Sequence, residues 1–71
     1  MGRAVEGLRH EADLTQEQLA DRMGIEFPSL GKLERGLRNP TFFSLLRLAR
    51  GLDIELSAVI QRYEQLRQGE D

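Results

Sequence analysis

The 71-residue sequence has no cysteine and only one histidine, His10. Without cysteine, the chain can form no disulfide, no thiolate metal site and no thiol nucleophile. His10 has no second histidine with which to share a zinc ion, so we expect neither a metal nor a cofactor. The sequence also shows no nucleophile–base pair and no phosphate-binding loop. It therefore argues against an enzyme, and no small-molecule substrate is evident.

Long apolar runs are also missing. No run approaches the roughly 20 residues that a membrane-spanning helix needs, and the N-terminus lacks the apolar segment of a signal peptide. We therefore expect no membrane partner and a cytoplasmic location. The length of 71 residues allows one domain, and a domain of this size buries only about 60% of the surface that its unfolded chain exposes. A partner subunit would help to stabilise it.

Charge of neither sign dominates the chain, whose formal net charge is −2, but the charges are unevenly distributed. Residues 1–31 carry three basic and six acidic side chains, and residues 51–71 again have a local charge of −3. Residues 32–50 carry five basic side chains and one acidic side chain. Because local field rather than net charge governs contact with phosphate, this segment is compatible with a nucleic-acid partner. An ordinary solvated surface explains it equally well.

Helix start and stop signals recur along the chain, and no segment alternates between apolar and polar residues as a strand does. Thr15 and Gln18 fit a capping box, Gly24 is a helix stop, and Thr41 is an N-cap after a break at Pro40. We therefore predict an all-α bundle of five helices. The expected ranges are residues 2–11, 16–23, 27–35, 42–52 and 56 to about 67, within a domain of residues 1–67, and residues 68–71 should fray. The apolar positions of the last two helices are Phe42, Leu45, Leu46, Ala49 and Leu52, then Leu56, Val59, Ile60, Tyr63 and Leu66.

The second and third predicted helices form a helix-turn-helix over about residues 15–35. Two short helices joined by a tight, glycine-entered turn have the geometry needed to offer one helix to a DNA major groove, which is about 12 Å wide. Many helical corners with this spacing bind nothing, so the spacing alone does not decide the function.

The residues themselves carry a more specific signal. The run Leu-Thr-Gln-Glu-Gln-Leu-Ala at 14–20 is followed by Gly-Ile at 24–25 and by Glu-Arg-Gly-Leu-Arg-Asn-Pro at 34–40. With Arg9 and the apolar residues of the fourth helix, these motifs closely resemble the phage-repressor (Cro/cI) family of helix-turn-helix proteins, also called the xenobiotic-response-element type. The resemblance covers about residues 1–60 and implies a lambda-repressor-like fold in which the third helix reads bases.

Carried over position by position, the resemblance implies a set of residues that contact double-stranded DNA. Gln16 would bind phosphate at the start of the second helix, where free N–H groups and the helix dipole favour an anion. Arg9 and Glu34 would form an interior salt bridge, and Asp13 and Asp53 stand where the family often has glycine. The positions expected on DNA are Gln16, Phe27, Pro28, Ser29, Gly31, Lys32, Arg35, Arg38 and Asn39.

The expected reading helix departs from its relatives, which are usually rich there in side chains that bond to base edges. Here Lys32 is the one strong donor and could reach guanine, while Phe27 could pack against a thymine methyl. Pro28 is tolerated near a helix start, where the first N–H groups lack partners within the helix. Glu26, at the N-cap, would repel phosphate if it pointed outward. These departures leave the fold unaffected and bear on sequence specificity.

The apolar stripe of the last helix continues past the region that a core this small needs to cover. We therefore expect Val59, Ile60, Tyr63 and Leu66 to form a homodimer interface, with a contribution from the start of the fourth helix. The function that follows is a sequence-specific transcription regulator, a repressor or controller, acting on a palindromic operator. The alternative is a protein-interaction module or antitoxin that keeps the fold and binds a protein partner through Phe27 and Leu37.

Overall fold

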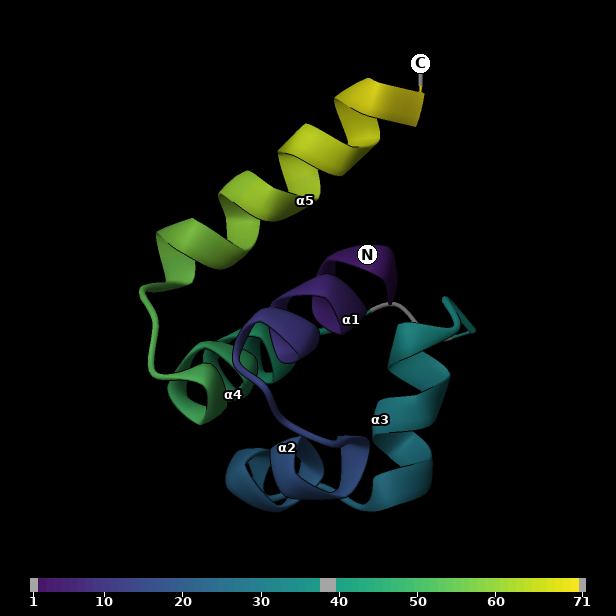
Figure 1. The fold of residues 1–71 in the computed structure, drawn as a ribbon, viewed down its shortest axis with the longest axis vertical. Coiled ribbons are helices and arrows are strands. Elements are labelled where there is room, and N and C mark those ends of the chain that lie inside the picture. Colours follow the sequence, from purple (N-terminus) through teal and green to yellow (C-terminus); the bar gives the residue numbers. More distant parts are fainter. Residues whose placement is uncertain (1, 38–39, 71) are drawn as a thin grey trace.

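The computed structural model describes residues 2–37 and 40–70, and all regular structure in these two ranges is helical. The helices are α1 (Gly2–Glu11), α2 (Gln16–Met23), α3 (Phe27–Glu34), α4 (Phe42–Leu52) and α5 (Leu56–Glu70). Figure 1 shows α1 crossing the middle of the molecule, with α5 on one side of it and α2 on the other. The all-helical prediction is confirmed. No helix of the described residues is long and apolar enough to span a bilayer.

Local signals explain where the helices begin and end. Thr15 Oγ1 accepts from Gln18 N at 3.1 Å, and Gln18 Oε1 accepts from Thr15 N at 2.9 Å, which completes the predicted capping box. Thr41 Oγ1 accepts from Ser44 N at 3.1 Å and begins α4 in the same way. Helix α3 ends at Glu34, one residue earlier than predicted, with Arg35 as its C-cap.

Helices α2 and α4 each end at a C-cap residue with a left-handed backbone conformation. Gly24, with φ of 71°, ends α2 at little steric cost because glycine has no Cβ. Asp53 ends α4 with φ of 58°, and Asp13 has φ of 60° in the turn after α1. These are the two aspartates that stand where relatives often have glycine. The backbone there does require the conformation that glycine favours.

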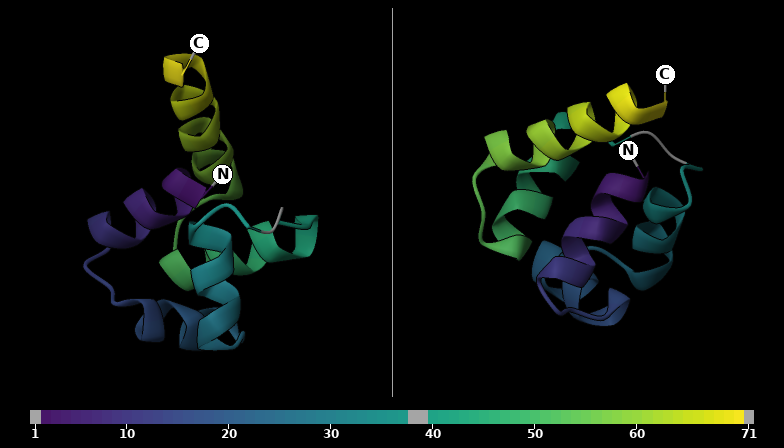
Figure 2. Two further views of the ribbon diagram at one scale, coloured as in Figure 1. Left: turned by 90° about the vertical axis from the view of Figure 1, so that its right-hand side faces the viewer. Right: turned by 45° about the horizontal axis from the view of Figure 1, so that its top comes forward.

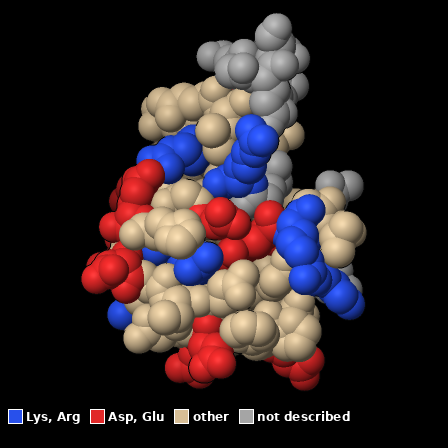
Figure 3. All heavy atoms as spheres, turned by 45° about the vertical axis from the view of Figure 1, so that its right-hand side comes forward, with Lys and Arg blue, Asp and Glu red and all other residues tan. Residues whose placement is uncertain are grey.

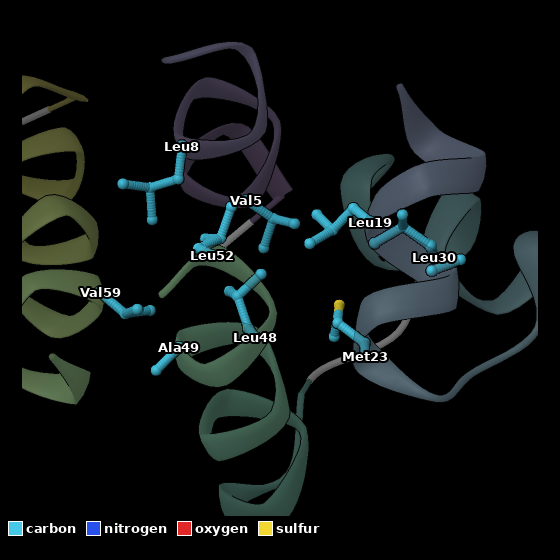
Figure 4. Close-up of a cluster of buried hydrophobic side chains, with 10 residues drawn as sticks. Val5, Leu8, Leu19, Met23, Leu30, Leu48, Ala49, Leu52 and Val59 are labelled. Carbon is cyan, nitrogen blue, oxygen red and sulfur yellow. The ribbon is translucent and has the colours of Figure 1, made fainter. Parts of the chain in front are cut away.

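A single apolar core lies where the helices meet. Helix α1 packs against α3, α4 and α5, while α2 packs against α3 and α4. Figure 2 shows the same arrangement from two further sides. The core side chains in Figure 4 come from all five helices, and each large one contributes about 1.5–3 kcal/mol on burial. The cluster comprises Val5, Leu8, Leu19, Ala20, Met23, Leu30, Leu48, Ala49, Leu52 and Val59.

Burial in the last two helices corrects one expectation about the dimer interface, the one at Val59. Phe42 lies on the apolar stripe of α4 but is 62% exposed, because the buried residues of α4 lie in its second half and its first turn extends past them. Val59 is fully buried in the core of its own chain, so its side chain is not available to a dimer partner. Helix α5 continues to Glu70, and the expected fraying of the tail stays a prediction.

Candidate nucleic-acid interface

The turn between α2 and α3 is tight because its first two residues bond back to carbonyls of α2. The N–H of Gly24 bonds to the carbonyl of Asp21 at 3.1 Å, and the N–H of Ile25 bonds to the carbonyl of Ala20 at 3.0 Å. Glu26 then starts α3 without a side-chain cap, and Pro28 occupies its first turn. The first turn of α2 lies against α3, where it shares a hollow with Phe27 and bonds to Glu34.

One side of α3 faces solvent and the other faces the core. Leu30 and Leu33 are buried. Phe27 is 45% exposed, and Ser29 and Gly31 are half-buried between the two sides. The exposed residues of the expected DNA contacts on and just after this helix are Phe27, Pro28, Lys32 and Arg35. A groove could therefore receive this side of α3 without any change in the core.

A shallow hollow of about 500 Å³ connects the starts of the two helices. Its wall is formed by Arg9, Thr15, Gln16, Glu17 and Phe27. The backbone N–H groups of Gln16 and Glu17 belong to the first turn of α2 and therefore lack partners within the helix. Gln16 and Phe27, which the resemblance places on phosphate and on bases respectively, thus line the same hollow. An extended ligand could contact both at once.

Arg9, in the wall of this hollow, is in contact with Glu34, as the resemblance implies. Arg9 Nε donates to Glu34 Oε2 at 2.8 Å, and Arg9 Nη2 donates to Glu34 Oε1 at 3.2 Å. Arg9 Nη1 also donates to the carbonyl of Leu14 at 3.0 Å. The carboxylate of Glu34 is only 2% exposed. The pair therefore ties α1, the α1–α2 turn and α3 together.

Gln16 joins this pair, which sequence reasoning missed. Its Nε2 donates to Glu34 Oε1 at 3.0 Å, across 18 positions of sequence. The bond anchors the first side chain of α2 to the end of α3. No local pattern signals a side-chain contact at this separation.

The charge on this surface is mixed. Figure 3 shows basic and acidic side chains interspersed on the face that includes α3, with acidic atoms along its lower edge. Glu17 and Glu26, at the starts of α2 and α3, are exposed beside the hollow. Arg38 and Asn39, also expected on DNA, lie outside the described residues. No group of three or more His, Asp or Glu that could hold a metal ion occurs in the described ranges.

The remaining predicted interface residues lie along α5. Ile60 is 39% exposed, and Tyr63 and Leu66 are half-buried. The start of α4, which is also expected to contribute to the interface, carries two exposed aromatic side chains, of which Phe43 was not singled out from the sequence. Phe42 and Phe43 are 62% and 74% exposed, and their rings pack edge to face with centroids 6.5 Å apart.

A core of five helices, with the start of α2 and the exposed side of α3 on one hollow, defines a helix-turn-helix DNA-binding domain. A sequence model of the helix-turn-helix family matches residues 6–59. The chain therefore belongs to this family, of the xenobiotic-response-element type that its motifs resemble.

Relatives of the chain are regulators of transcription rather than enzymes. An uncharacterised helix-turn-helix-type transcriptional regulator of Sinorhizobium fredii is 47% identical over 47 residues, which make up 66% of this chain and 61% of that protein. The immunity repressor of Bacillus phage phi105 is 33% identical over 60 residues, which make up 84% of this chain and 42% of the repressor. The chain thus spans about half the length of these relatives.

Solved structures share the fold. The restriction-modification controller protein C.AhdI from Aeromonas hydrophila is 38% identical and superposes with a TM-score of 0.78, covering 82% of this chain and 88% of the controller. A mutant of the restriction-modification controller protein C.Esp1396I superposes with a TM-score of 0.90 over 99% of this chain and 91% of its own. At 24% identity, the second likeness shows the fold alone.

Proposed function

We propose that this chain is a sequence-specific transcription regulator, a repressor or controller, that binds a palindromic operator as a homodimer. The observation that carries the proposal is the shared hollow, because Gln16 at the start of α2 and Phe27 at the start of α3 both line it, so one ligand could contact both. Helix α3 would enter the major groove while the N-terminus of α2 contacts phosphate. We expect the protein to act in the cytoplasm, where a bacterial or phage operator lies.

Within this arrangement the exposed residues of α3 divide into two roles. Lys32 and Phe27 would face the groove floor, where a cation can bond to guanine and an aromatic ring can pack against a thymine methyl. Arg35 follows the helix and would contact backbone phosphate, as would Arg38 and Asn39. Phosphate contacts hold the protein in register and carry no sequence information directly.

The exposed apolar groups support the homodimer. Phe42 and Phe43 at the start of α4, and Ile60 on α5, are exposed although each is strongly apolar. Covering them in a two-fold interface removes this surface from water. Ile60, Tyr63 and Leu66 keep the role that the sequence suggests for them, without Val59. A dimer would hold its two reading helices roughly 34 Å apart, one turn of DNA.

A protein-interaction module remains the second candidate. Leu37 is 70% exposed and Phe27 is 45% exposed, so the two residues expected to bind a protein partner are accessible. This surface also carries carboxylates that oppose phosphate. Salt-dependent binding to DNA separates the two functions, since the regulator requires it and the module does not.

The test is selection of bound sequences from a random DNA pool, followed by titration of variants. Lys32→Ala or Phe27→Ala should cost about 1–3 kcal/mol on the selected operator and little on random DNA. Arg35→Ala should weaken both DNAs equally and lower the salt slope by about one unit. If Lys32→Ala and Phe27→Ala leave operator preference intact, α3 is not the reading element. Absence of salt-dependent binding to any DNA supports the protein-interaction module instead.

A further inference from the structure

The side chain of Gln16 is held in place before any ligand arrives. Its Nε2 carries two hydrogens, and one of them is committed to Glu34 Oε1 at 3.0 Å. Among the described residues the second hydrogen has no protein acceptor. The same side chain lines the hollow at the start of α2. One hydrogen is therefore anchored and the other is available to a ligand in the hollow.

The anchor itself is rigid because its own partners are fixed. Glu34 receives two bonds from Arg9, and its side chain is 2% exposed. Arg9 is fixed in turn by the carbonyl of Leu14 at 3.0 Å. With the bond from Gln16, Oε1 accepts two N–H groups and Oε2 accepts one. The carboxylate, buried and held by three hydrogen bonds, thus supports the Gln16 amide in one orientation.

We propose that Glu34 is a positioning residue for DNA binding, which acts by fixing the Gln16 amide toward a backbone phosphate. This proposal rests on the proposed function and assigns to the buried pair a role beyond stability. Freezing a flexible side chain on binding costs about 0.5–1.5 kcal/mol. A side chain ordered in the free protein avoids that cost, so loss of the Glu34 support should weaken DNA binding about two- to tenfold. The loss should be equal on operator and random DNA, because phosphate is read on both.

The test is a double-mutant cycle of Gln16→Ala and Glu34→Gln in DNA binding, measured on variants shown to be folded at the assay temperature. Glu34→Gln should weaken binding two- to tenfold in the parent chain and not at all in the Gln16→Ala chain. Glu55→Gln is the matched control for loss of a negative charge. Glu55 is exposed in the α4–α5 turn, which Figure 1 shows on the opposite side of the molecule from α3.

A second measurement needs no variant and covers the case in which Glu34→Gln does not fold. Relaxation of the Gln16 side-chain amide in the free protein should give an order parameter near the rigid-backbone value of about 0.85. A value under about 0.6 means a mobile amide and overturns the proposal.

The possible outcomes distinguish failure of the Glu34 proposal from failure of the proposed function. Equal losses from Glu34→Gln in the parent and Gln16→Ala chains mean that Glu34 acts only through the fold, which overturns the inference. If the parent binds DNA but Gln16→Ala costs nothing, Gln16 is not a phosphate contact, and the inference fails while the regulator stands. If the parent shows no salt-dependent binding to any DNA, the proposed function itself fails.

Discussion

Replacing Arg9 by alanine should remove a large part of the free energy of unfolding. The substitution deletes both hydrogen bonds to Glu34 and the one to the carbonyl of Leu14. Glu34 would keep only the bond from Gln16, while its side chain is 2% exposed. Breaking a buried pair on one side costs about 3–5 kcal/mol, because the remaining charge is left without compensation. Small domains have only about 5–15 kcal/mol in total, so the variant should be close to unfolded at 37 °C.

Urea denaturation followed by circular dichroism measures this loss. Arg47→Ala is the control, because Arg47 is exposed on α4 and surface substitutions stay within about 0.5 kcal/mol. The double variant Arg9→Met, Glu34→Leu tests the cause. Replacing both charges by apolar side chains of similar volume leaves no buried charge uncompensated, although the Leu14 carbonyl and the Gln16 amide lose a partner, so it should recover much of the lost stability. Equal, small losses in Arg9→Ala and Arg47→Ala would refute the reasoning, since they would mean that solvent reaches Glu34.

Three further predictions concern packing, backbone and charge. Gly51→Ala should lower the free energy of unfolding by about 1 kcal/mol, since the new Cβ would lie 3.1 Å from Met23 Cγ. Gly31→Ala should raise the free energy of unfolding by about as much, because a Cβ there has no atom within 4 Å and alanine favours the helix. Urea denaturation of both variants measures the two changes. Asp53 has a φ of 58°, which strains any residue with a Cβ. Asp53→Gly should remove this strain, stabilise the fold by about 0.5 kcal/mol and raise the thermal midpoint, whereas Asp53→Ala should bring no gain. The hydrogen bond from Arg62, with Nη2 2.7 Å from Oε1, lowers the pKa of Glu11 from its usual 4.5. The stability from this pair is therefore present above the unfolded pKa and lost as pH falls through the folded value. Thermal midpoints of the parent and Glu11→Gln should differ at pH 7 and converge as the pH falls through the lowered pKa of Glu11; a constant gap would contradict the pairing.

The helix boundaries were predictable because their signals are local. A cap acts over three or four residues, so Thr15, Gln18 and Thr41 indicate in the sequence where their helices begin. The left-handed backbone at Asp13 and Asp53 could be predicted only from the resemblance, since aspartate by itself does not indicate a left-handed conformation. The pairing of Arg9 with Glu34 could also be predicted only from the resemblance, because the two residues lie 25 positions apart.

What the sequence could not supply is which neighbour covers an apolar residue. Val59 and Ile60 are adjacent on one apolar stripe, yet Val59 is fully buried by its own chain and Ile60 is 39% exposed. Phe42 has the periodicity of a core residue, but it is 62% exposed, and the buried residues of α4 lie in the second half of that helix. The bond from Gln16 to Glu34 depends on how α2 and α3 sit together. Each of these facts belongs to the tertiary arrangement and has no local pattern.

The mixed charge around α3 bears on how a protein of net charge −2 would bind DNA. Glu17 and Glu26 are exposed beside the hollow, so they oppose the phosphates that Lys32 and Arg35 would attract. Affinity for random DNA rests almost entirely on phosphate neutralisation, whereas contacts to base edges add affinity only on the right sequence. Carboxylates at this position therefore reduce the affinity for random DNA and for the operator by the same factor. The ratio of the two affinities is then set by Lys32 and Phe27. On this reasoning, Glu26→Gln should tighten binding to both DNAs equally, and a gain confined to the operator would show that Glu26 contacts a base.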